Sequence, residues 1–308
     1  MKKLLVAVLI IVIAFVSIYI FIPAKITFSK VIFIKTKPTI ANRFLMDETK
    51  WNNWFPFAEG VDKGYRYNNY NYSIKKQMMN TAEILMENKQ ASLKSIASII
   101  SMNKDSIAIE WKSEFPKSFN PIKKLMNYFN ARGLQKNMND ILNQLKIFLE
   151  NTEKVYGFNF HEIISKDSTL IATKCETTTY PTTNDIYTLV KNLKQYIYNN
   201  GAKESNYPML HVKQLDNNTF ETMVAIPINK RLEGNGIIFS KRFVPWKVLT
   251  ARINGGNYTV NKGFKQMELY LTDFQKTAMA IPFASLETDR NLQPDTSKWI
   301  TSIYTPVP

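Results

Sequence analysis

The chain has 308 residues, of which 45% are hydrophobic and 13% aromatic, which is enough apolar material for two packed domains and excludes global disorder. Its net charge is +15, but the lysines are scattered without a dense basic run, so we expect no nucleic-acid partner. The single cysteine, Cys175, excludes an internal disulfide, and the distant His161 and His211 give no metal-ligand spacing, so we expect no metal or cofactor and assign no catalytic residue.

The N-terminal segment is an uncharged apolar run over residues 4–22 that follows Lys2 and Lys3 and ends at Pro23. About 19 residues suffice to cross a hydrocarbon layer of ~30 Å at ~1.5 Å per residue. A cleaved signal peptide is the alternative, but its apolar region is normally shorter, and residues 20–23 make a poor cleavage context. We therefore predict that residues 1–24 form an uncleaved, single-pass transmembrane anchor of bacterial type.

Charges beside this segment bear on its orientation and on a lipid partner. Lys2 and Lys3 favour an N-terminus inside the cell, which would place the soluble part on the extracytoplasmic side. Four lysines follow the anchor and weaken that bias, while suiting contact with anionic lipid: Lys25, Lys30, Lys35 and Lys37. Membrane association through the N-terminal helix is thus expected, with anionic lipid as a candidate partner.

The first soluble domain is predicted over residues 25–152. Alternating apolar residues indicate a strand over 26–37, a short helix follows over 39–46, and strand-like runs include 92–101 and 106–111. An amphipathic helix is predicted over 121–150, because apolar residues recur there at spacings of three and four. These positions are Ile122, Leu125, Met126, Phe129, Met138, Ile141, Leu142, Leu145 and Leu149.

The segment FLMDETKWNNWFPF, between the first helix and the strand series, carries a resemblance. Its matching residues are Asp47, Lys50, Trp51, Trp54, Pro56 and Phe57. With the surrounding order of elements, this domain resembles the SRPBCC (START-like, helix-grip) superfamily. The resemblance implies a curved antiparallel sheet around a long C-terminal helix, enclosing an apolar cavity. Trp51 and Trp54 would then either line the mouth of the cavity as ligand-binding residues or pack as structural residues.

The second soluble domain, residues 153–308, contains a diverged internal repeat. The segment TTTYPTTNDIYTLVKNLKQYIYNNG aligns with NGGNYTVNKGFKQMELYLTDF, which places Tyr180 opposite Tyr258. Strands are predicted over 162–178 and 236–253, each followed by an amphipathic helix and by a strand that ends in a proline step. The pattern predicts an α+β fold class with a pseudo-twofold duplicated β-α-β-β domain.

A block of residues in the second domain carries another resemblance: Ala225, Ile226, Pro227, Gly256, Tyr258, Glu287, Pro294, Asp295, Lys298, Trp299, Thr301, Ile303, Tyr304, Pro306 and Val307. With these residues the domain resembles the GyrI-like small-molecule-binding domain, which also forms the effector-binding part of AraC- and MerR-type regulators. The resemblance implies a groove between the repeats. In it Glu287 would attract cationic aromatic ligands, and Tyr258, Trp299 and Tyr304, with Tyr180, would supply aromatic walls. Alternatively, Glu287 is a solvated carboxylate or pairs with a cation such as Arg290, and Trp299 and Tyr304 belong to the core.

Together these features predict a membrane-anchored protein that binds a small hydrophobic or cationic aromatic molecule without catalysis. The alternative is a hydrolase- or cyclase-type enzyme, for which Glu287 with Tyr258 or Tyr304 would be the candidate acid–base pair. A third hypothesis is an envelope interaction protein in which both cavities are filled. Because fold resemblance alone does not define function, the arrangement of the site residues has to decide.

Overall fold

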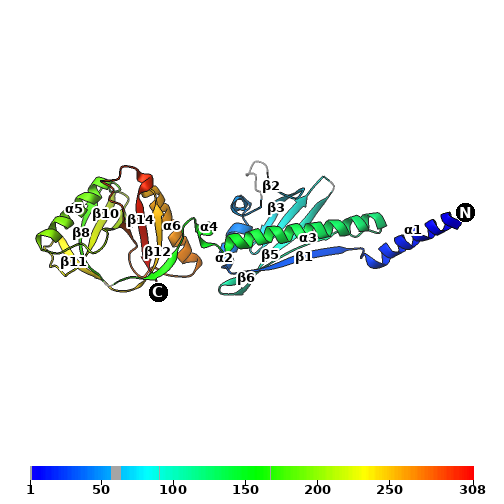
Figure 1. Ribbon diagram of the computed structural model, residues 1–308, viewed down its shortest axis with the longest axis horizontal. Coiled ribbons are helices and arrows are strands. Elements are labelled where there is room, and N and C mark those ends of the chain that lie inside the picture. Colours follow the sequence, from blue (N-terminus) through cyan, green and yellow to red (C-terminus); the bar gives the residue numbers. More distant parts are fainter. Residues whose placement is uncertain (1, 57–63, 90, 167) are drawn as a thin grey trace. The chain divides into compact units, whose positions relative to one another are not determined.

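The computed structural model describes residues 2–56, 64–89, 91–166 and 168–308; Phe57 of the tryptophan motif lies outside these ranges (Figure 1). The chain divides into two compact units, Met1–Asn151 and Thr152–Pro308, called here the N-terminal and C-terminal units. The sequence predicts domains over residues 25–152 and 153–308. Whether each unit folds alone stays a prediction.

The N-terminal apolar segment forms helix α1 (Lys2–Phe21), in which most side chains that the structure describes are exposed. Among the described helices it is the one that is long and apolar enough to cross a membrane, over Lys3–Phe21. The hydroxyl of Ser17 donates a hydrogen bond to the Ile13 carbonyl (2.8 Å), so this polar group is satisfied within the helix. Length and composition thus fit a spanning helix, and insertion itself stays a prediction.

The N-terminal unit contains an antiparallel sheet in the order β1-β6-β5-β4-β3-β2, with helix α3 (Pro121–Leu149) packed mainly against β1. Alternate residues of β1 are buried because one face of the strand meets the helix. The remaining elements of this unit are β1 (Ile26–Ile34), α2 (Pro38–Leu45), the 3-10 helix η1 (Glu48–Asn53), β2 (Tyr65–Tyr67), β3 (Tyr70–Met78), β4 (Thr81–Glu87), β5 (Ser92–Asn103) and β6 (Ser106–Phe115).

Helix α3 departs from the sequence expectation in one respect. Its C-terminal apolar positions, from Met138 to Leu149, are buried against the unit, as expected for an amphipathic helix. Its first apolar positions are exposed instead: Ile122, Leu125, Met126 and Phe129. At about 100° per residue these four lie on the side of the helix opposite the buried face. The spacing rule holds within each group, but the helix has two apolar faces rather than one.

The C-terminal unit contains a second antiparallel sheet in the order β11-β8-β10-β9-β13-β14-β12-β7. Helix α5 (Thr183–Asn199) packs on β8 and β10, and helix α6 (Asn257–Asp273) packs on β12 and β14. The other elements are α4 (Thr152–Tyr156), β7 (His161–Ile164), β8 (Ser168–Thr177), β9 (Met209–Asp216), β10 (Thr219–Ile228), β11 (Ile238–Phe243), β12 (Lys247–Asn254), β13 (Phe283–Leu286), the 3-10 helix η3 (Thr296–Lys298) and β14 (Ile300–Pro306).

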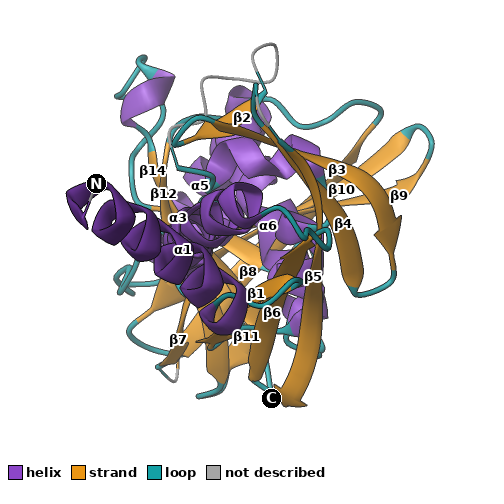
Figure 2. Ribbon diagram, turned by 90° about the vertical axis from the view of Figure 1, so that its right-hand side faces the viewer, coloured by secondary structure: helices purple, strands orange, loops and turns teal. Residues whose placement is uncertain are grey.

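Both sheets are curled rather than flat, and the mixed α+β class expected from the sequence is confirmed (Figure 2). Each long strand expected at the start of a repeat is instead two strands, β7 with β8 and β11 with β12. Hydrogen bonds join the two segments in which the strands are interrupted. The Ser165 amide donates to the Trp246 carbonyl (2.8 Å), and the Trp246 amide donates to Ser165 Oγ (2.8 Å). The chain changes sheet partners at these breaks, pairing β7 with β12 and β11 with β8.

Candidate ligand-binding site

A cavity of about 270 Å³ lies on the sheet face of the C-terminal unit that points away from α5 and α6. Ile253 and Ile303 mark the face of the sheet that α6 covers, because both side chains approach Gly263 of that helix. A Cβ added at Gly263 would collide with the Ile253 side chain. The cavity lies on the opposite face and is lined by Ile163, Ile164, Ser165, Lys166, Ser168, Leu170, Asn206, Tyr207, Met209, Pro227, Phe243, Val248, Phe283, Ser285 and Tyr304. Both halves of the sheet therefore contribute to one site.

Three aromatic rings form one wall of this cavity. Phe283 and Tyr304 are directly paired across β13 and β14, and their rings stack at 5.0 Å with an interplanar angle of 14°. Phe243 meets Phe283 edge to face, at 5.6 Å and 86°. Directly paired residues share one face of a sheet, so strand register fixes this wall before any ligand arrives. Both geometries are favourable for aromatic pairs and leave ring surface for a further planar group.

The lining also carries polar groups. Ser165, Ser168, Ser285 and Asn206 supply hydroxyl and amide groups, and Lys166 supplies the one formal charge among the described lining residues. Tyr207 and Tyr304 add phenol groups. Asp167, between Lys166 and Ser168, lies outside the described residues. An apolar, aromatic-walled cavity with a few convergent polar groups is the usual composition of a small-molecule site. Its charge and hydroxyl groups suit a ligand with hydrogen-bond acceptors.

Glu287 lies just beyond β13, on the same sheet face as the cavity but outside its lining. Its neighbour Leu286 is buried on the helix side, so strand alternation turns Glu287 the other way. Its carboxylate accepts hydrogen bonds from Arg252 Nε and Nη2, both at 3.0 Å, and from Ser302 Oγ at 2.5 Å. Arg252 thus offsets the charge of Glu287, and Arg290, considered as its partner from sequence, lies elsewhere. Selection of cations by Glu287 stays a prediction.

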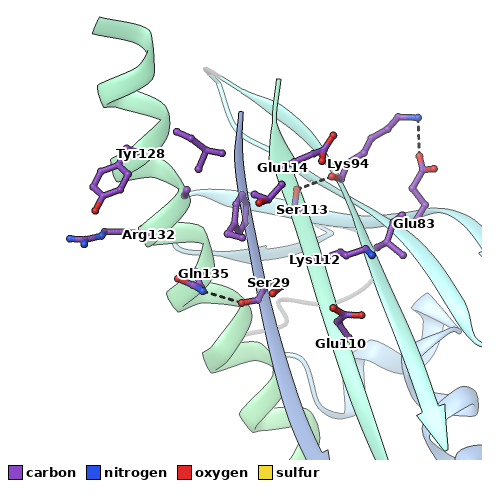
Figure 3. A pocket seen from close by; sticks show the side chains of 15 residues that line it. Ser29, Glu83, Lys94, Glu110, Lys112, Ser113, Glu114, Tyr128, Arg132 and Gln135 are labelled. Atoms are coloured by element: carbon purple, nitrogen blue, oxygen red, sulfur yellow. Dashed lines mark hydrogen bonds and ion pairs between the residues drawn. The ribbon is translucent and has the colours of Figure 1, made fainter. Parts of the chain in front are cut away.

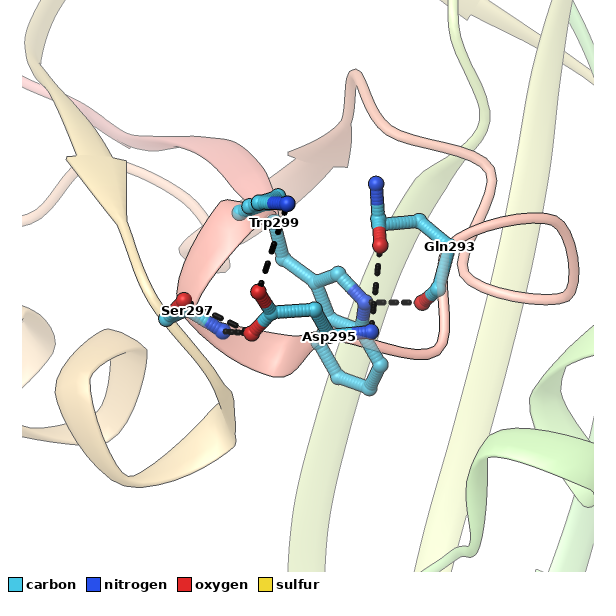
Figure 4. Close-up of polar contacts among 5 residues, drawn as sticks. Gln293, Asp295, Ser297 and Trp299 are labelled. Carbon is cyan, nitrogen blue, oxygen red and sulfur yellow. Dashed lines mark hydrogen bonds and ion pairs between the residues drawn. The ribbon is translucent and has the colours of Figure 1, made fainter.

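Trp299 is buried in the loop before β14. Figure 4 shows its polar contacts: the indole Nε1 donates to the Gln293 carbonyl at 2.7 Å, and Asp295 accepts hydrogen bonds from the amide and hydroxyl of Ser297 in the adjoining turn. The guanidinium of Arg290 covers the ring at 4.6 Å. Both indole edge and indole face are occupied by this loop, which matches the core-packing alternative for Trp299.

Arg290 itself is buried, and its guanidinium connects three segments. Nη1 donates to Asn257 Oδ1 (2.8 Å) and Nη2 donates to Thr301 Oγ1 (3.1 Å), while its backbone amide donates to the Tyr187 hydroxyl (2.8 Å). Burial lowers the pKa of Arg290 and raises the pKa of Tyr187. These contacts join α5 and α6 to the loop before β14 and hold Trp299 away from the cavity.

The two tyrosines matched by the repeat alignment lie at unlike positions. Tyr258 is 85% exposed in the first turn of α6, whereas Tyr180 precedes α5 and packs edge to face on Phe220 at 5.8 Å. Neither belongs to the cavity lining. Of the predicted ligand-binding residues in the C-terminal unit, Tyr304 is the one that lines the cavity.

Trp51 and Trp54 are buried in the N-terminal unit. Their indole Nε1 atoms donate to the carbonyls of Leu45 and Phe44, each at 2.9 Å, which fixes η1 to the end of α2. Trp51 stacks on Phe55 at 5.5 Å and meets Tyr65 edge to face at 5.2 Å. Their hydrogen bonds and ring contacts are those of structural residues, and a ligand-binding role for them stays a prediction.

The N-terminal unit also has an open hollow of about 730 Å³ between β1, the neighbouring strands and α3 (Figure 3). Its lining carries charges of both signs, from Glu83, Lys94, Glu110, Lys112, Glu114 and Arg132. Lys94 pairs with Glu83 at 2.9 Å, and Glu114 pairs with Lys25 at 2.8 Å. Because these charges largely offset one another, the hollow resembles an ordinary solvated surface.

Sequence reasoning missed most of the cavity wall, including Phe243, Phe283 and Met209. A usable signal existed for Phe283, because it stands two residues before Ser285 and four before Glu287 and therefore shares their strand face. Phe243 gave no such signal, since its place on the wall depends on the antiparallel pairing of β11 with β8. That pairing joins segments some 70 residues apart and has no local signature.

No family model matches the chain, and no curated protein matches it. Among solved structures, the EcmrR C-terminal domain is 13% identical, with a TM-score of 0.43 and coverage of 49% of this chain and 98% of that one. SAV2435 bound to tetraphenylphosphonium is 15% identical (TM-score 0.32; 49% and 94% covered). A START superfamily protein from Mycobacterium smegmatis is 13% identical (TM-score 0.29; 40% and 97% covered). With such low TM-scores, the functional proposal rests on the cavity itself.

Proposed function

We propose that the chain is a membrane-anchored small-molecule-binding protein, with its ligand in the cavity of the C-terminal unit. The observation that carries this proposal is the preformed wall of Phe243, Phe283 and Tyr304 around an apolar space. Rings that already hold each other in place lose little conformational freedom when a ligand binds, so more of the contact energy remains as affinity. The site therefore suits a planar aromatic molecule.

The ligand is small and neutral or weakly acidic. A cavity of about 270 Å³ is at the lower end of ligand sites, which favours one or two rings. Lys166 and Ser285 provide donors for oxygen atoms on the ligand, since the hydroxyls of Ser165 and Ser168 donate to backbone carbonyls. A cationic ligand would meet the Lys166 ammonium, and the carboxylate of Glu287 is already engaged by Arg252. Hydrophobic aromatics are thus favoured over cationic ones.

Helix α1 is proposed to hold this protein in the membrane as an uncleaved anchor, with both units on the extracytoplasmic side. The uninterrupted apolar surface of α1 and the paired lysines before it support this orientation. A full chain that remains in the membrane fraction after carbonate washing, with Lys2 and Lys3 still present by mass spectrometry, is the expected result. Release without detergent, or a mature N-terminus near Ala24, would overturn it.

We also propose that the C-terminal unit is a pseudo-twofold duplication. Read inward from its two edges, the sheet gives β11-β8-β10-β9 and β7-β12-β14-β13, in which corresponding strands occupy corresponding repeat positions. The cavity then lies between the two halves, which accounts for its lining by both. The same duplication explains why each half has one helix on the outer face.

Binding is tested by titration calorimetry on the detergent-solubilised full chain. The probes are 2-naphthol as the neutral aromatic and 1-methylquinolinium, a two-ring cation of similar size, as the cationic one. Replacing Phe283 with Ala should weaken 2-naphthol about tenfold, since an aromatic pair contributes ~1 kcal/mol beyond its buried area. The control is Tyr258→Ala, which alters an exposed ring outside the lining. Equal affinity in all three proteins would overturn the proposed site.

A second variant separates loss of binding from loss of folding. Ser285→Leu adds volume at the cavity without removing any ring of the wall, so it should reduce 2-naphthol binding while the thermal unfolding temperature stays within a few degrees of wild type. Chromatography of 2-naphthyl acetate recovered after incubation distinguishes binding from the hydrolase alternative. Unchanged ester supports a binding protein, and cavity-dependent hydrolysis would favour the enzyme.

A further inference from the structure

The first two turns of α3 carry an apolar stripe whose side chains are exposed in the described chain. Ile122 (61% exposed), Met126 (53%) and Phe129 (60%) stand in one row, with Leu125 beside them, and Phe119 (65%) precedes the helix. The row continues as Gly133 and Lys136, so its apolar character stops after Phe129. A contiguous exposed apolar patch of this kind normally marks a contact surface.

The stripe does not serve the core of the N-terminal unit. The buried residues at this end of α3 are Lys124, Asn127 and Ala131, on the opposite side of the helix. Over residues 122–129, polar side chains are therefore buried and large apolar side chains are exposed. Further along α3 the buried side chains are mostly apolar, so the first two turns show the opposite distribution. Contact with water would not favour the exposure of these apolar side chains, whereas contact with the apolar part of a membrane would.

Contacts with α1 locate the stripe beside the end of the proposed membrane span. The Tyr19 hydroxyl donates to the Phe119 carbonyl, and the Lys124 ammonium lies 4.9 Å from the Tyr19 ring centre. Tyr19 is within the apolar span Lys3–Phe21. The start of α3 and the last turn of α1 are therefore neighbours, and Figure 1 shows α1 meeting α3 at this end. If α1 spans the bilayer, the first turn of α3 lies at the bilayer surface.

Side chains around the stripe match the chemistry of that boundary. Lys117 lies over the Phe119 ring at 4.8 Å, and both Lys117 and Lys123 are exposed, with no acidic partner among the described residues. Long basic side chains can cover apolar surface while their ammonium groups reach lipid phosphates.

We propose that residues 119–129 form a second membrane contact, in which Phe119, Ile122, Met126 and Phe129 insert into the boundary between lipid headgroups and acyl chains. This inference rests on the proposed anchoring by α1 and goes beyond it, because a single helix alone leaves the attached unit free to swivel. A second contact point fixes the N-terminal unit against the membrane surface. The occupant of the stripe is the lipid of the membrane that α1 crosses.

The test places an NBD fluorophore at single cysteines in the full chain, with Cys175 replaced by Ser, in phosphatidylcholine–phosphatidylglycerol vesicles. The three sites are Met126→Cys on the stripe, Ile147→Cys as control and Val12→Cys within α1. Ile147 is equally exposed (54%) and on the same side of α3, but lies about 30 Å further along the helix. Nitroxides attached near the headgroup or near the acyl-chain end report the depth of each label.

At position 126 we expect blue-shifted emission and quenching by the shallow nitroxide, whereas position 147 should be quenched only by aqueous iodide. Iodide quenching at both 126 and 147, with deep quenching at position 12, would overturn the second contact and leave the anchor intact. A label at 126 that neither nitroxide nor iodide reaches would indicate a protein partner and also overturn the proposal. Absence of deep quenching at position 12 would refute the anchor and, with it, this inference.

Discussion

The two units use aromatic residues in opposite ways. In the N-terminal unit, Trp51, Trp54 and Phe55 fill the interior, and both indoles donate to backbone carbonyls of α2. In the C-terminal unit, Phe243, Phe283 and Tyr304 stand around a cavity on the face of the sheet that the helices leave uncovered. The comparison shows that an aromatic motif does not reveal a ligand site. The side of the sheet on which the rings fall decides between packing and binding.

The largest expected effect concerns the filled interior. Trp51→Ala should lower the free energy of unfolding of the N-terminal unit by about 3–5 kcal/mol, because it leaves a cavity among Phe55, Tyr65 and Trp54. Chemical denaturation followed by circular dichroism measures the loss. The exposed Tyr258→Ala serves as the control and should change stability by less than about 0.5 kcal/mol. A Trp51→Ala protein as stable as wild type would show that these rings are not the core.

The same variant also tests whether the units are independent domains. If residues 25–152 and 153–308 fold separately, Trp51→Ala should leave 2-naphthol binding by the C-terminal unit unchanged at a denaturant concentration that unfolds only the N-terminal unit. Titration of the variant under those conditions measures it. Loss of binding together with the N-terminal unit would mean that the two units share one folding transition.

A smaller effect is expected at the ion pair next to the cavity. Arg252→Gln removes the guanidinium that engages Glu287, so the two-ring cation 1-methylquinolinium should bind more tightly by a few-fold, or about 0.5–1 kcal/mol for a partly exposed charge. Glu287→Gln in the same background should remove the gain. Affinity for neutral 2-naphthol should be the same in all of these proteins. An unchanged cation affinity in Arg252→Gln would mean that Glu287 plays no part in ligand choice.

The smallest effect distinguishes the units by their response to acid. Among the described groups with shifted pKa values, those of the N-terminal unit are buried tyrosines, such as Tyr72, whereas the C-terminal unit also has carboxyls with lowered pKa values. The pKa of Asp185 is lowered by hydrogen bonds from Thr182, and that of Glu221 by a hydrogen bond from Lys174. A lowered pKa gives stability above the unfolded value, ~3.9 for Asp and ~4.3 for Glu, and this stability is lost as the pH falls through the folded value.

Acid should therefore destabilise the C-terminal unit more than the N-terminal one. Thermal unfolding between pH 5 and about pH 2.5 would measure this difference. Loss of 2-naphthol binding reports the unfolding of the C-terminal unit, and near-ultraviolet circular dichroism follows the N-terminal unit. Glu221→Gln and Asp185→Asn should each reduce the pH dependence of the C-terminal transition. An acid response unaffected by both substitutions would assign it to other groups.

Local sequence patterns predicted most elements but not their faces. The helix over 121–150 and the strands over 92–101 and 106–111 were expected within a few residues of α3, β5 and β6, because periodicity is a local property. The spacing of Ile122 to Phe129 looked like the start of a core face. Its position opposite Met138 becomes visible only when the angle around the helix is compared with the sheet.

The residues of the candidate site were only partly predictable. Strand alternation turned Glu287 away from Leu286, but the partner of Glu287 is Arg252, 35 residues earlier in the chain. Trp299 is an aromatic residue of the kind that lines cavities, but here it stabilises a loop. Its indole Nε1 donates to the Gln293 carbonyl, and the Arg290 guanidinium lies over its ring. No spacing in the sequence encodes such contacts, since they arise where distant segments meet.

By itself, the sequence determined the apolar N-terminal helix and the α+β class, because length, hydrophobic periodicity and composition are read along the chain. The tertiary structure alone decided that aromatic rings fill one unit and surround a cavity in the other. It also decided that the first turns of α3 turn their apolar side outward beside α1. Burial depends on what each face meets across the fold, and that is set by long-range strand pairing and helix packing rather than by neighbouring residues.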